Sequence, residues 1–127
     1  EMILKESTQE NVQEYATYIH RSSHALLALI NDILDFSKIE AGKLDIDIDT
    51  FDFGALIGKI IEEFYFKAAQ KHINLSYTID PHIPDMLSGD SKRLRQILVN
   101  IINNAIKFTD KGEVELSVHL QEEQNIL

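Results

Sequence analysis

The sequence contains no cysteine, only two prolines and no long apolar run. The absence of cysteine excludes disulfides, thiolate zinc sites, iron–sulfur clusters and a cysteine nucleophile, and it fits a reducing compartment. The longest clean apolar run, residues 25–30, is far shorter than the roughly 18 residues that a membrane span needs. Residues 1–6 lack the basic and then apolar layout of a signal peptide. We therefore expect a cytoplasmic segment without direct membrane contact.

Positive charge is also scarce, because 12 basic residues stand against 21 acidic ones and the net charge is −9. This balance disfavours nucleic acid and anionic membrane surfaces as partners, since both reward lysine and arginine. Apolar residues make up 44% of the 127 residues, which is enough to form a core. The length allows one domain, or one small domain plus part of another.

The first third of the chain has the periodicity of a long amphipathic helix. Apolar or small residues recur in steps of three and four, which defines a heptad seam: Val12, Tyr15, Ile19, Ser22, Leu26, Leu29, Ile33 and Phe36. Leu27, Ile30 and Leu34 widen this seam to a face suited to a four-helix bundle. A capping box at residues 7–10 and the glycine at Gly42 predict a helix over residues 8–40, about 50 Å long. Such a helix cannot bury its face alone, so we expect a second copy as partner.

From residue 44 onward the pattern alternates between strand and helix periods. Strands are predicted at residues 44–49, 73–79 and 113–120, and a loop at residues 81–84. Asp52 and Asp90 are predicted N-caps, the second of a helix ending near Phe108. After Asp52, apolar residues follow at helical spacing: Leu56, Ile57, Ile60, Ile61, Phe64 and Ala68. We expect turns at residues 110–112 and 121–125, and the start of another strand at residues 126–127. This order predicts a sheet covered by helices on one face.

The helix after Asp90 has two distinct faces at 100° per residue. The predicted core face contains Leu94, Ile97, Leu98, Ile101, Ile102, Ala105 and Phe108. A polar stripe on the opposite side contains Arg93, Gln96, Asn100, Asn104 and Lys107, with Asn103 at its edge.

Asparagine is a poor helix former, so three asparagines within five residues need a reason. Asn100 and Asn104 are one turn apart, and Lys107 follows three residues later. Carboxamide oxygens can enter a magnesium shell without adding charge, and a lysine can neutralise phosphate oxygens. The stripe suits a magnesium–triphosphate complex, although a solvated polar face with incidental asparagines has the same pattern.

Two separate segments resemble sensor histidine kinases. Residues 93–109 (RLRQILVNIINNAIKFT) are similar to the asparagine-box helix of that family, and the flanking pairs at residues 89–90 and 111–112 match as well. Residues 33–44 (ILDFSKIEAGKL) resemble the end of the second bundle helix of these kinases. The two signatures occur in the family's order and spacing.

The resemblance implies an α+β fold, in which the long helix of a dimeric four-helix bundle precedes part of an ATPase α/β sandwich. Residues 1–43 would belong to the dimerisation and histidine-phosphotransfer region, and residues 44–127 to the N-terminal part of the catalytic ATP-binding domain. Asn104 would be the main magnesium ligand, Asn100 would lie beside the metal and phosphates, and Lys107 would contact the phosphates. Gln96 and Asn103 are second-rank candidates.

The implied reaction is transfer of the ATP γ-phosphoryl group, with Mg²⁺, to a histidine and then to an aspartate of a response-regulator receiver domain. The implied partners are a second copy of the chain, through the heptad helix, and that receiver domain.

The sequence departs from the family in two ways. The phosphoacceptor motif, similar to Ser-His-Glu-Leu-Arg-Thr-Pro, is absent, so we expect that histidine upstream of Glu1, with residues 1–6 as the tail of its helix. We interpret His20 and His24 as ordinary helix residues at the rim of the bundle and assign none of the five histidines to a metal site. The family's glycine-rich adenine and lid motifs are also absent. We therefore expect the 127-residue chain alone to be inactive and to bind ATP without useful affinity.

Two alternatives remain open at this point. The chain could be a non-catalytic dimerisation and signal-relay module from a degenerate kinase, although a relic would not need to keep Asn100, Asn104 and Lys107 aligned. Topoisomerase-type or chaperone-type ATPases of the same superfamily carry an acidic residue where this chain has Asn100, and they lack the preceding heptad helix.

Overall fold

The computed structural model describes residues 2–121, with side chains for residues 8–121. The chain divides into two compact units, Glu1–Asp45 and Ile46–Leu127. Within the described residues, no helix is long and apolar enough to cross a membrane. The turn expected at residues 121–125, apart from residue 121 itself, and the strand start expected at residues 126–127 lie outside the described part.

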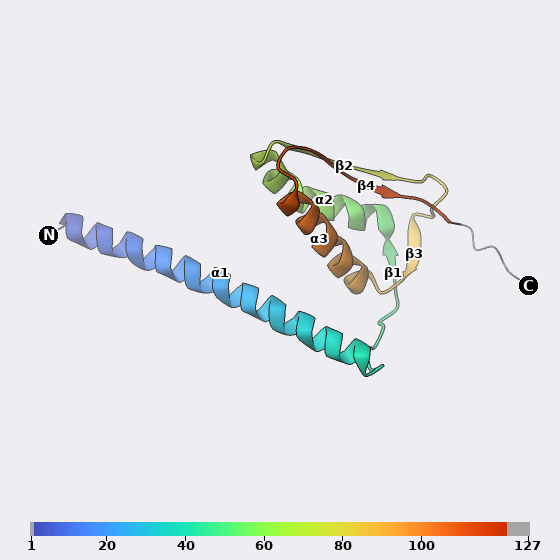
Figure 1. The fold of residues 1–127 in the computed structure, drawn as a ribbon, viewed down its shortest axis with the longest axis horizontal. Helices are drawn as coiled ribbons and strands as arrows, with labels where there is room; N and C mark the ends of the chain where they lie inside the picture. Colours follow the sequence, from blue (N-terminus) through green and yellow to red (C-terminus); the bar gives the residue numbers. More distant parts are fainter. Residues whose placement is uncertain (1, 122–127) are drawn as a thin grey trace, which may run out of the picture. The chain divides into compact units, whose positions relative to one another are not determined.

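The first unit is one helix, α1, which spans Met2–Glu40 (Figure 1). It ends close to the predicted position, because Gly42, two residues after Glu40, has a φ of +64°, the left-handed conformation that glycine adopts without strain. The Lys43 N–H donates to the Lys38 carbonyl at 2.8 Å and closes the last turn. We expected this helix to begin with a cap at Ser7 and a separate element to precede it, and both predictions are wrong. Residues 2–10 contain no proline or glycine, so helix propensity continues without a break.

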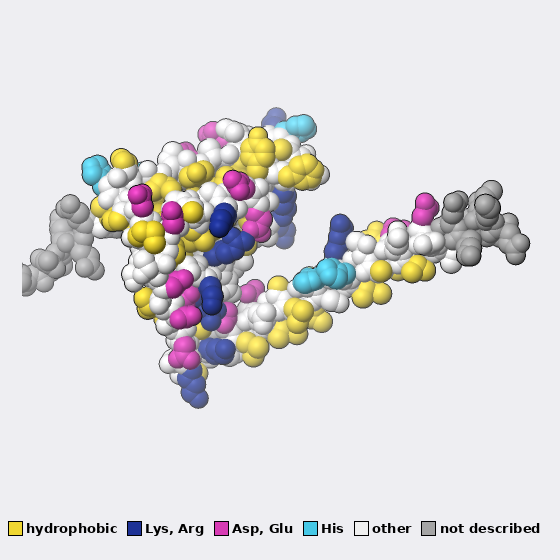
Figure 2. All heavy atoms as spheres, turned by 180° about the vertical axis from the view of Figure 1, so that it is seen from behind, with side chains coloured by type: hydrophobic (Ala, Val, Ile, Leu, Met, Phe, Trp, Pro, Cys, Tyr) yellow, Lys and Arg dark blue, Asp and Glu magenta, His cyan; other side chains and the backbone are white. Residues whose placement is uncertain are grey.

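The heptad seam of α1 lies on the surface of this unit. Its large apolar side chains, from Val12 to Phe36, are all exposed. Hydrophobic side chains follow the long helix in the space-filling view (Figure 2).

The second unit contains four strands and two helices. Strand β1 spans Asp49–Asp52 and pairs antiparallel with β3, Met86–Gly89. Strand β2, Ile73–Ile79, pairs in parallel with β4, Gly112–Val118, over seven residue pairs from Ile73↔Gly112 to Ile79↔Val118. Helices α2, Phe53–Gln70, and α3, Ser91–Phe108, cover one face of the β2–β4 pair (Figure 1). The predicted α+β class and the helix-covered sheet are confirmed.

The core of this unit is built mainly from α2 and completed by β2 and α3. Its buried residues are Phe53, Ile57, Ile60, Ile61, Phe64, Ala68, Ile73, Leu75, Ile102 and Ile106. The helical spacing of the α2 positions is the one expected from the sequence. Asp52 caps α2 as predicted, because its Oδ1 accepts the Ala55 N–H at 2.7 Å.

Two strand assignments need correction. Residues 44–48 are not a strand despite their strict alternation, since Ile46 and Ile48 are exposed and the Asp47 N–H donates to the Asp90 side chain instead of a neighbouring strand. Strand β1 begins only at Asp49. Strand β3 was not predicted, because its four residues directly follow the proline loop and are too few to establish a period.

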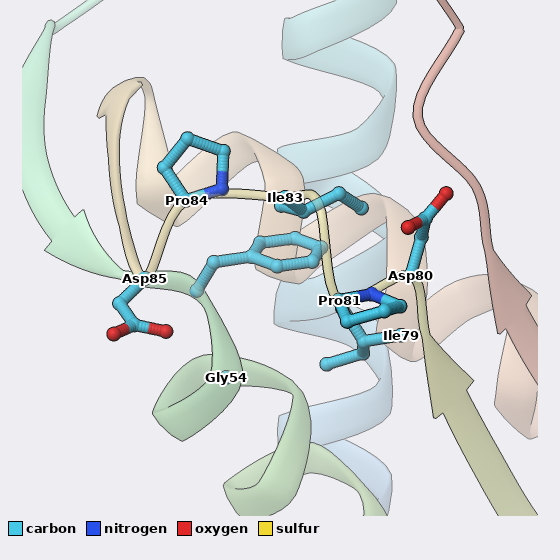
Figure 3. A pocket seen from close by; sticks show the side chains of 8 residues that line it. Gly54, Ile79, Asp80, Pro81, Ile83, Pro84 and Asp85 are labelled. Carbon is cyan, nitrogen blue, oxygen red and sulfur yellow. The ribbon is translucent and has the colours of Figure 1, made fainter.

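A shallow depression lies between the start of α2 and the loop that follows β2. Its volume is about 220 Å³, and its lining includes Gly54, Ile79, Pro81 and Ile83. Figure 3 shows the carboxylates of Asp80 and Asp85 at opposite sides of this loop, pointing away from its centre. None of the residues on the polar stripe of α3 lines it.

Candidate functional site

The site predicted from the sequence lies on α3, and Asp90 fixes where this helix begins. The Asp90 Oδ1 accepts the Arg93 N–H at 3.0 Å, as expected of an N-cap. Its Oδ2 accepts the Asp47 N–H, also at 3.0 Å. The bond from the Arg93 backbone, followed by the bond from Asp47, lowers the pKa of Asp90 below its ordinary value. One carboxylate therefore starts α3 and holds the segment before β1 against it.

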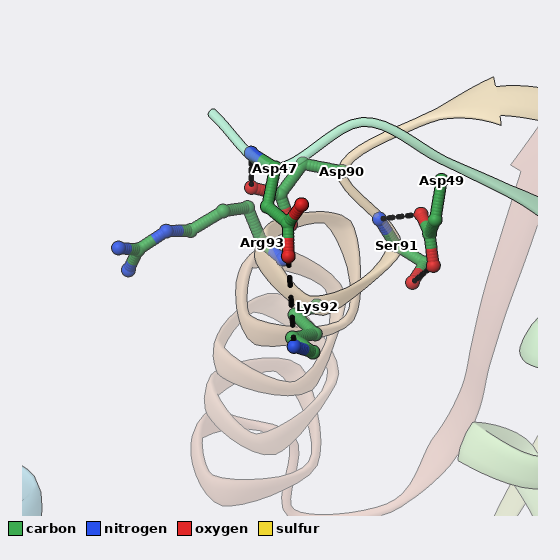
Figure 4. A network of polar contacts seen from close by, with 6 residues as sticks. All are labelled: Asp47, Asp49, Asp90, Ser91, Lys92 and Arg93. Carbon is green, nitrogen blue, oxygen red and sulfur yellow. Dashed lines mark hydrogen bonds and ion pairs between the residues drawn. The ribbon is translucent and has the colours of Figure 1, made fainter. Parts of the chain in front are cut away.

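Asp49 provides a second anchor at the same end of the helix (Figure 4). It accepts the Ser91 hydroxyl at 2.7 Å and the Ser91 N–H at 3.1 Å. The hydroxyl bond is the main reason that the pKa of Asp49 is lowered. The ion pair of Lys92 with Asp47, at 3.8 Å between exposed side chains, adds little. This network joins residues more than forty positions apart, so no local sequence pattern could indicate it.

Side chains of α2 and of Lys71, the residue directly after it, hold α3 in place. The Lys71 ammonium donates to the carbonyl oxygens of Ile106 at 2.7 Å and of Lys107 at 3.1 Å. The Lys67 ammonium donates to the Asn103 Oδ1 at 2.5 Å. Nearer the start of α3, Arg95 forms an ion pair with Glu63 of α2. These contacts fix how α3 is rotated about its own axis.

The core face predicted for α3 is wrong in part, because the helix is rotated differently. Ile102 and Ile106 are the buried residues of α3, with Leu98 and Val99 partly buried beside them. Ile97, Ile101 and Phe108 were expected in the core, but they are 55%, 55% and 76% exposed. Apolar residues cover so much of this helix that periodicity alone could not locate the centre of the buried face. Contacts with α2 and the sheet decide it.

The same rotation leaves three of the predicted site residues on open surface. Asn100, Asn104 and Lys107 are exposed and lie one helical turn apart from each other in succession. No hydrogen bond to the Asn100 or Asn104 side chain is found among residues 8–121. The Lys107 ammonium lies 5.2 Å from the centroid of the Phe108 ring. Both amide oxygens and the ammonium are therefore accessible to a ligand.

The two second-rank candidates are engaged within the protein. The Asn103 oxygen accepts the Lys67 ammonium. The Gln96 Oε1 accepts the Arg93 guanidinium at 3.2 Å. Within the described part of the chain, no group of three or more His, Asp or Glu side chains could hold a metal ion. Oxygen ligands from asparagine, completed by water and phosphate, are thus the form that a magnesium site on this helix can take.

Known proteins share the sequence pattern and the fold of this chain. Residues 1–42 match the family described as the His Kinase A (phospho-acceptor) domain. Over 123 residues, or 97% of this chain, the sequence is 45% identical to hybrid signal transduction histidine kinase L of Dictyostelium discoideum. The chain belongs to the sensor histidine kinase family. It spans only 7% of the length of that relative.

Solved structures of histidine kinases share the fold of this chain. Full-length ShkA in complex with AMPPNP matches with a TM-score of 0.73 and 31% identity, over 87% of this chain and 24% of that one. Histidine kinase ThkA in complex with the response regulator protein TrrA matches with a TM-score of 0.52 and 20% identity, over 72% of this chain and 28% of that one. At that identity the second match shows the fold alone.

Proposed function

We propose that this chain is part of an ATP-dependent protein-histidine kinase of a two-component system. The intact kinase transfers the ATP γ-phosphoryl group to a histidine, and from there to an aspartate of a response-regulator receiver domain. The observation that carries the proposal is the exposure of Asn100 and Asn104 on a helix whose neighbouring amides, Asn103 and Gln96, are engaged within the protein. The ATP analogue bound by ShkA and the regulator bound by ThkA support the choice of nucleotide and partner.

The residues present fit a magnesium–nucleotide site. Asn104 would be the main ligand of Mg²⁺, Asn100 would lie beside the metal and the phosphates, and Lys107 would contact the phosphates. Mg²⁺, when bound, offsets negative charge on the phosphoryl group. The protein's own contribution is rigidity: Asp90, Asp49 and Lys71 hold α3 at both ends, so its polar stripe is in place before nucleotide binds.

The two units have different roles in this proposal. Residues 1–43 belong to the dimerisation and histidine-phosphotransfer region, and residues 44–127 to the catalytic ATP-binding domain. None of the five histidines has the sequence context of the family's phosphoacceptor, so we propose that the phosphoacceptor is not among them. The exposed heptad seam of α1 is the surface through which two copies associate.

The test is autophosphorylation of the intact kinase that contains this segment, measured with labelled ATP and Mg²⁺. Asn104→Ala is expected to reduce the rate by about a hundredfold or more, because it removes a group that stabilises charge in the transition state. Asn74→Ala replaces an exposed asparagine on β2 and is the matched control. An Asn104→Ala kinase with the rate of the control would contradict the catalytic role.

The alternative, a non-catalytic dimerisation and signal-relay module, makes the opposite prediction. Such a module would form dimers and bind its partner equally well with or without Asn104, and the intact protein would incorporate no label. The accessible stripe of Asn100, Asn104 and Lys107 favours the kinase, because a docking module has no use for unpaired amides on this helix.

A further inference from the structure

Two histidines converge on the surface of α1, far along the chain from the stripe on α3. His20 and His24 are four residues apart, and their Nε2 atoms lie 3.2 Å from each other. The ring centroids are 4.4 Å apart and the rings are tilted by 57°. Both residues are exposed, and histidine side chains form a continuous patch on the long helix in Figure 2. Their His-x-x-x-His spacing places both rings on one side of the helix, which corrects the interpretation of the two residues as ordinary positions without metal-ligand spacing.

The separation of the two nitrogens is the separation that one metal ion requires. Imidazole nitrogens bind Zn²⁺ at about 2.0–2.1 Å, so two ligands of a tetrahedral ion lie about 3.3 Å apart. Two adjacent ligands of a square-planar Cu²⁺ ion at a similar bond length lie about 2.9 Å apart. The observed 3.2 Å falls between these values. A neutral pair can share one N–H···N hydrogen bond in this geometry. A metal ion bound to both Nε2 atoms would take the place of that hydrogen bond, and the proton would move to Nδ1 of the same ring, so both ligands stay neutral imidazoles.

We propose that His20 and His24 form a two-histidine chelate for a late first-row divalent cation, with Zn²⁺ or Cu²⁺ as the ligand class. The neighbouring hydroxyls are engaged by the helix backbone, since Thr17 donates to the Gln13 carbonyl and Ser23 to the Ile19 carbonyl. No third histidine or carboxylate joins the pair within the described residues. Water therefore completes the coordination shell, and the ion remains open to exchange.

The position of the pair separates this site from the dimer surface. With Ile19 and Leu26 at position a of the heptad, His20 falls at position b, the edge of the widened apolar face that Leu27 also occupies. His24 falls at position f, on the outer side, so neither histidine stands at an a or d position of the seam. A metal ion can therefore bind without displacing side chains of the seam. It bridges two successive turns and binds only when the helix is formed, so it stabilises the helical state of α1.

The test is titration of the full 127-residue chain with Zn²⁺ alone by isothermal calorimetry in a buffer that does not bind the metal. The wild type is expected to bind one ion per chain. His20→Gln, His24→Gln and the double variant should each lose affinity by at least about tenfold and to a similar extent, because either substitution destroys the chelate. Glutamine is a good helix former, and circular dichroism should show that helix content is retained.

His119→Gln removes an exposed histidine at the end of β4 and is the matched control, with affinity expected to remain that of the wild type. Cu²⁺ electron paramagnetic resonance provides the second measurement, and coupling to two nitrogen nuclei is expected in the wild type and the control alone. The proposal is overturned if the single substitutions leave Zn²⁺ affinity unchanged, if their effects are independent and only add up in the double variant, or if His119→Gln has the same effect.

Discussion

The Lys71 ammonium donates a hydrogen bond to the carbonyl oxygen of Ile106 at 2.7 Å and reaches the next carbonyl, that of Lys107, at 3.1 Å. One side chain, that of the residue directly after α2, thus satisfies two carbonyls in the last turn of α3, where the helix has no partners of its own. The residue whose backbone it holds, Lys107, is the residue proposed to contact phosphate. Lys71 therefore links the packing of the core to the placement of the site.

Replacement of this lysine tests the link. Lys71→Met keeps most of the side-chain volume and removes the charged donor, so the free energy of unfolding should fall by about 1–2 kcal/mol. The measurement is urea denaturation followed by circular dichroism. Lys111→Met, in the exposed turn before β4, is the control and should change stability by less than about 0.5 kcal/mol. Equal stability of the two variants would mean that Lys71 does not anchor α3.

A second prediction concerns the buried face of α3. Ile106 is 0% exposed and Ile101 is 55% exposed on the same helix. Ile106→Ala should lower the free energy of unfolding by about 2–5 kcal/mol, because it leaves a cavity in the core. Ile101→Ala should change it by no more than about 0.5 kcal/mol. The measurement is urea denaturation of the 127-residue chain. A larger loss of stability in Ile101→Ala than in Ile106→Ala would contradict the buried face of α3 and support the core face predicted from the sequence.

Some features of this fold could be predicted from local sequence, and others could not. The caps at Asp52 and Asp90 and the helix end at Gly42 depend on residues within four positions of each other, and these predictions are confirmed. The rotation of α3 depends on Lys67 of α2 and on Lys71 directly after it, both more than thirty residues away from their partners. The strand expected at residues 44–49 failed for the same reason, since Asp47 bonds to Asp90.

The candidate site shows the same division. The spacing of Asn100, Asn104 and Lys107 could be found in the sequence, because one helix places all three on one side. The sequence could not show that Asn103 and Gln96 are engaged while Asn100 and Asn104 are accessible, since their neighbours in space decide it.

Acid should weaken the anchor between β1 and α3. Hydrogen bonds from Ser91 lower the pKa of Asp49 below its ordinary value near 3.8, so the ionised form is favoured in the folded state. This contribution to stability is present above the unfolded pKa and is lost as the pH falls through the lower folded pKa. Asp49→Asn should therefore be less stable than wild type at pH 6, and the difference should shrink below about pH 4.

The measurement is the free energy of unfolding from urea titrations between pH 2 and pH 6. Asp110→Asn, an exposed aspartate in the turn before β4, is the matched control and should follow the wild-type curve throughout. A wild type and an Asp49→Asn variant that differ by the same amount at every pH would show that the ionised carboxylate is not what stabilises the anchor.

The seam of α1 predicts association of two chains. Leu26 is exposed at a seam position, and burial of a leucine contributes about 1.5–3 kcal/mol in each of two chains. Leu26→Glu should weaken a dimer by about a hundredfold or more. Light scattering coupled to gel filtration at tens of micromolar checks this, with Asn31→Glu on the outer face as the control. A monomeric wild type at that concentration would contradict the dimer surface.

The most direct measurement of the central claim is the affinity of the intact kinase for AMPPNP with and without Mg²⁺, for the wild type and for Asn104→Ala. The account predicts that Mg²⁺ strengthens binding to the wild type by about tenfold or more and that this gain disappears in Asn104→Ala, while Asn74→Ala retains it. A full Mg²⁺-dependent gain in Asn104→Ala would show that the polar stripe of α3 does not hold the metal-bound end of the nucleotide.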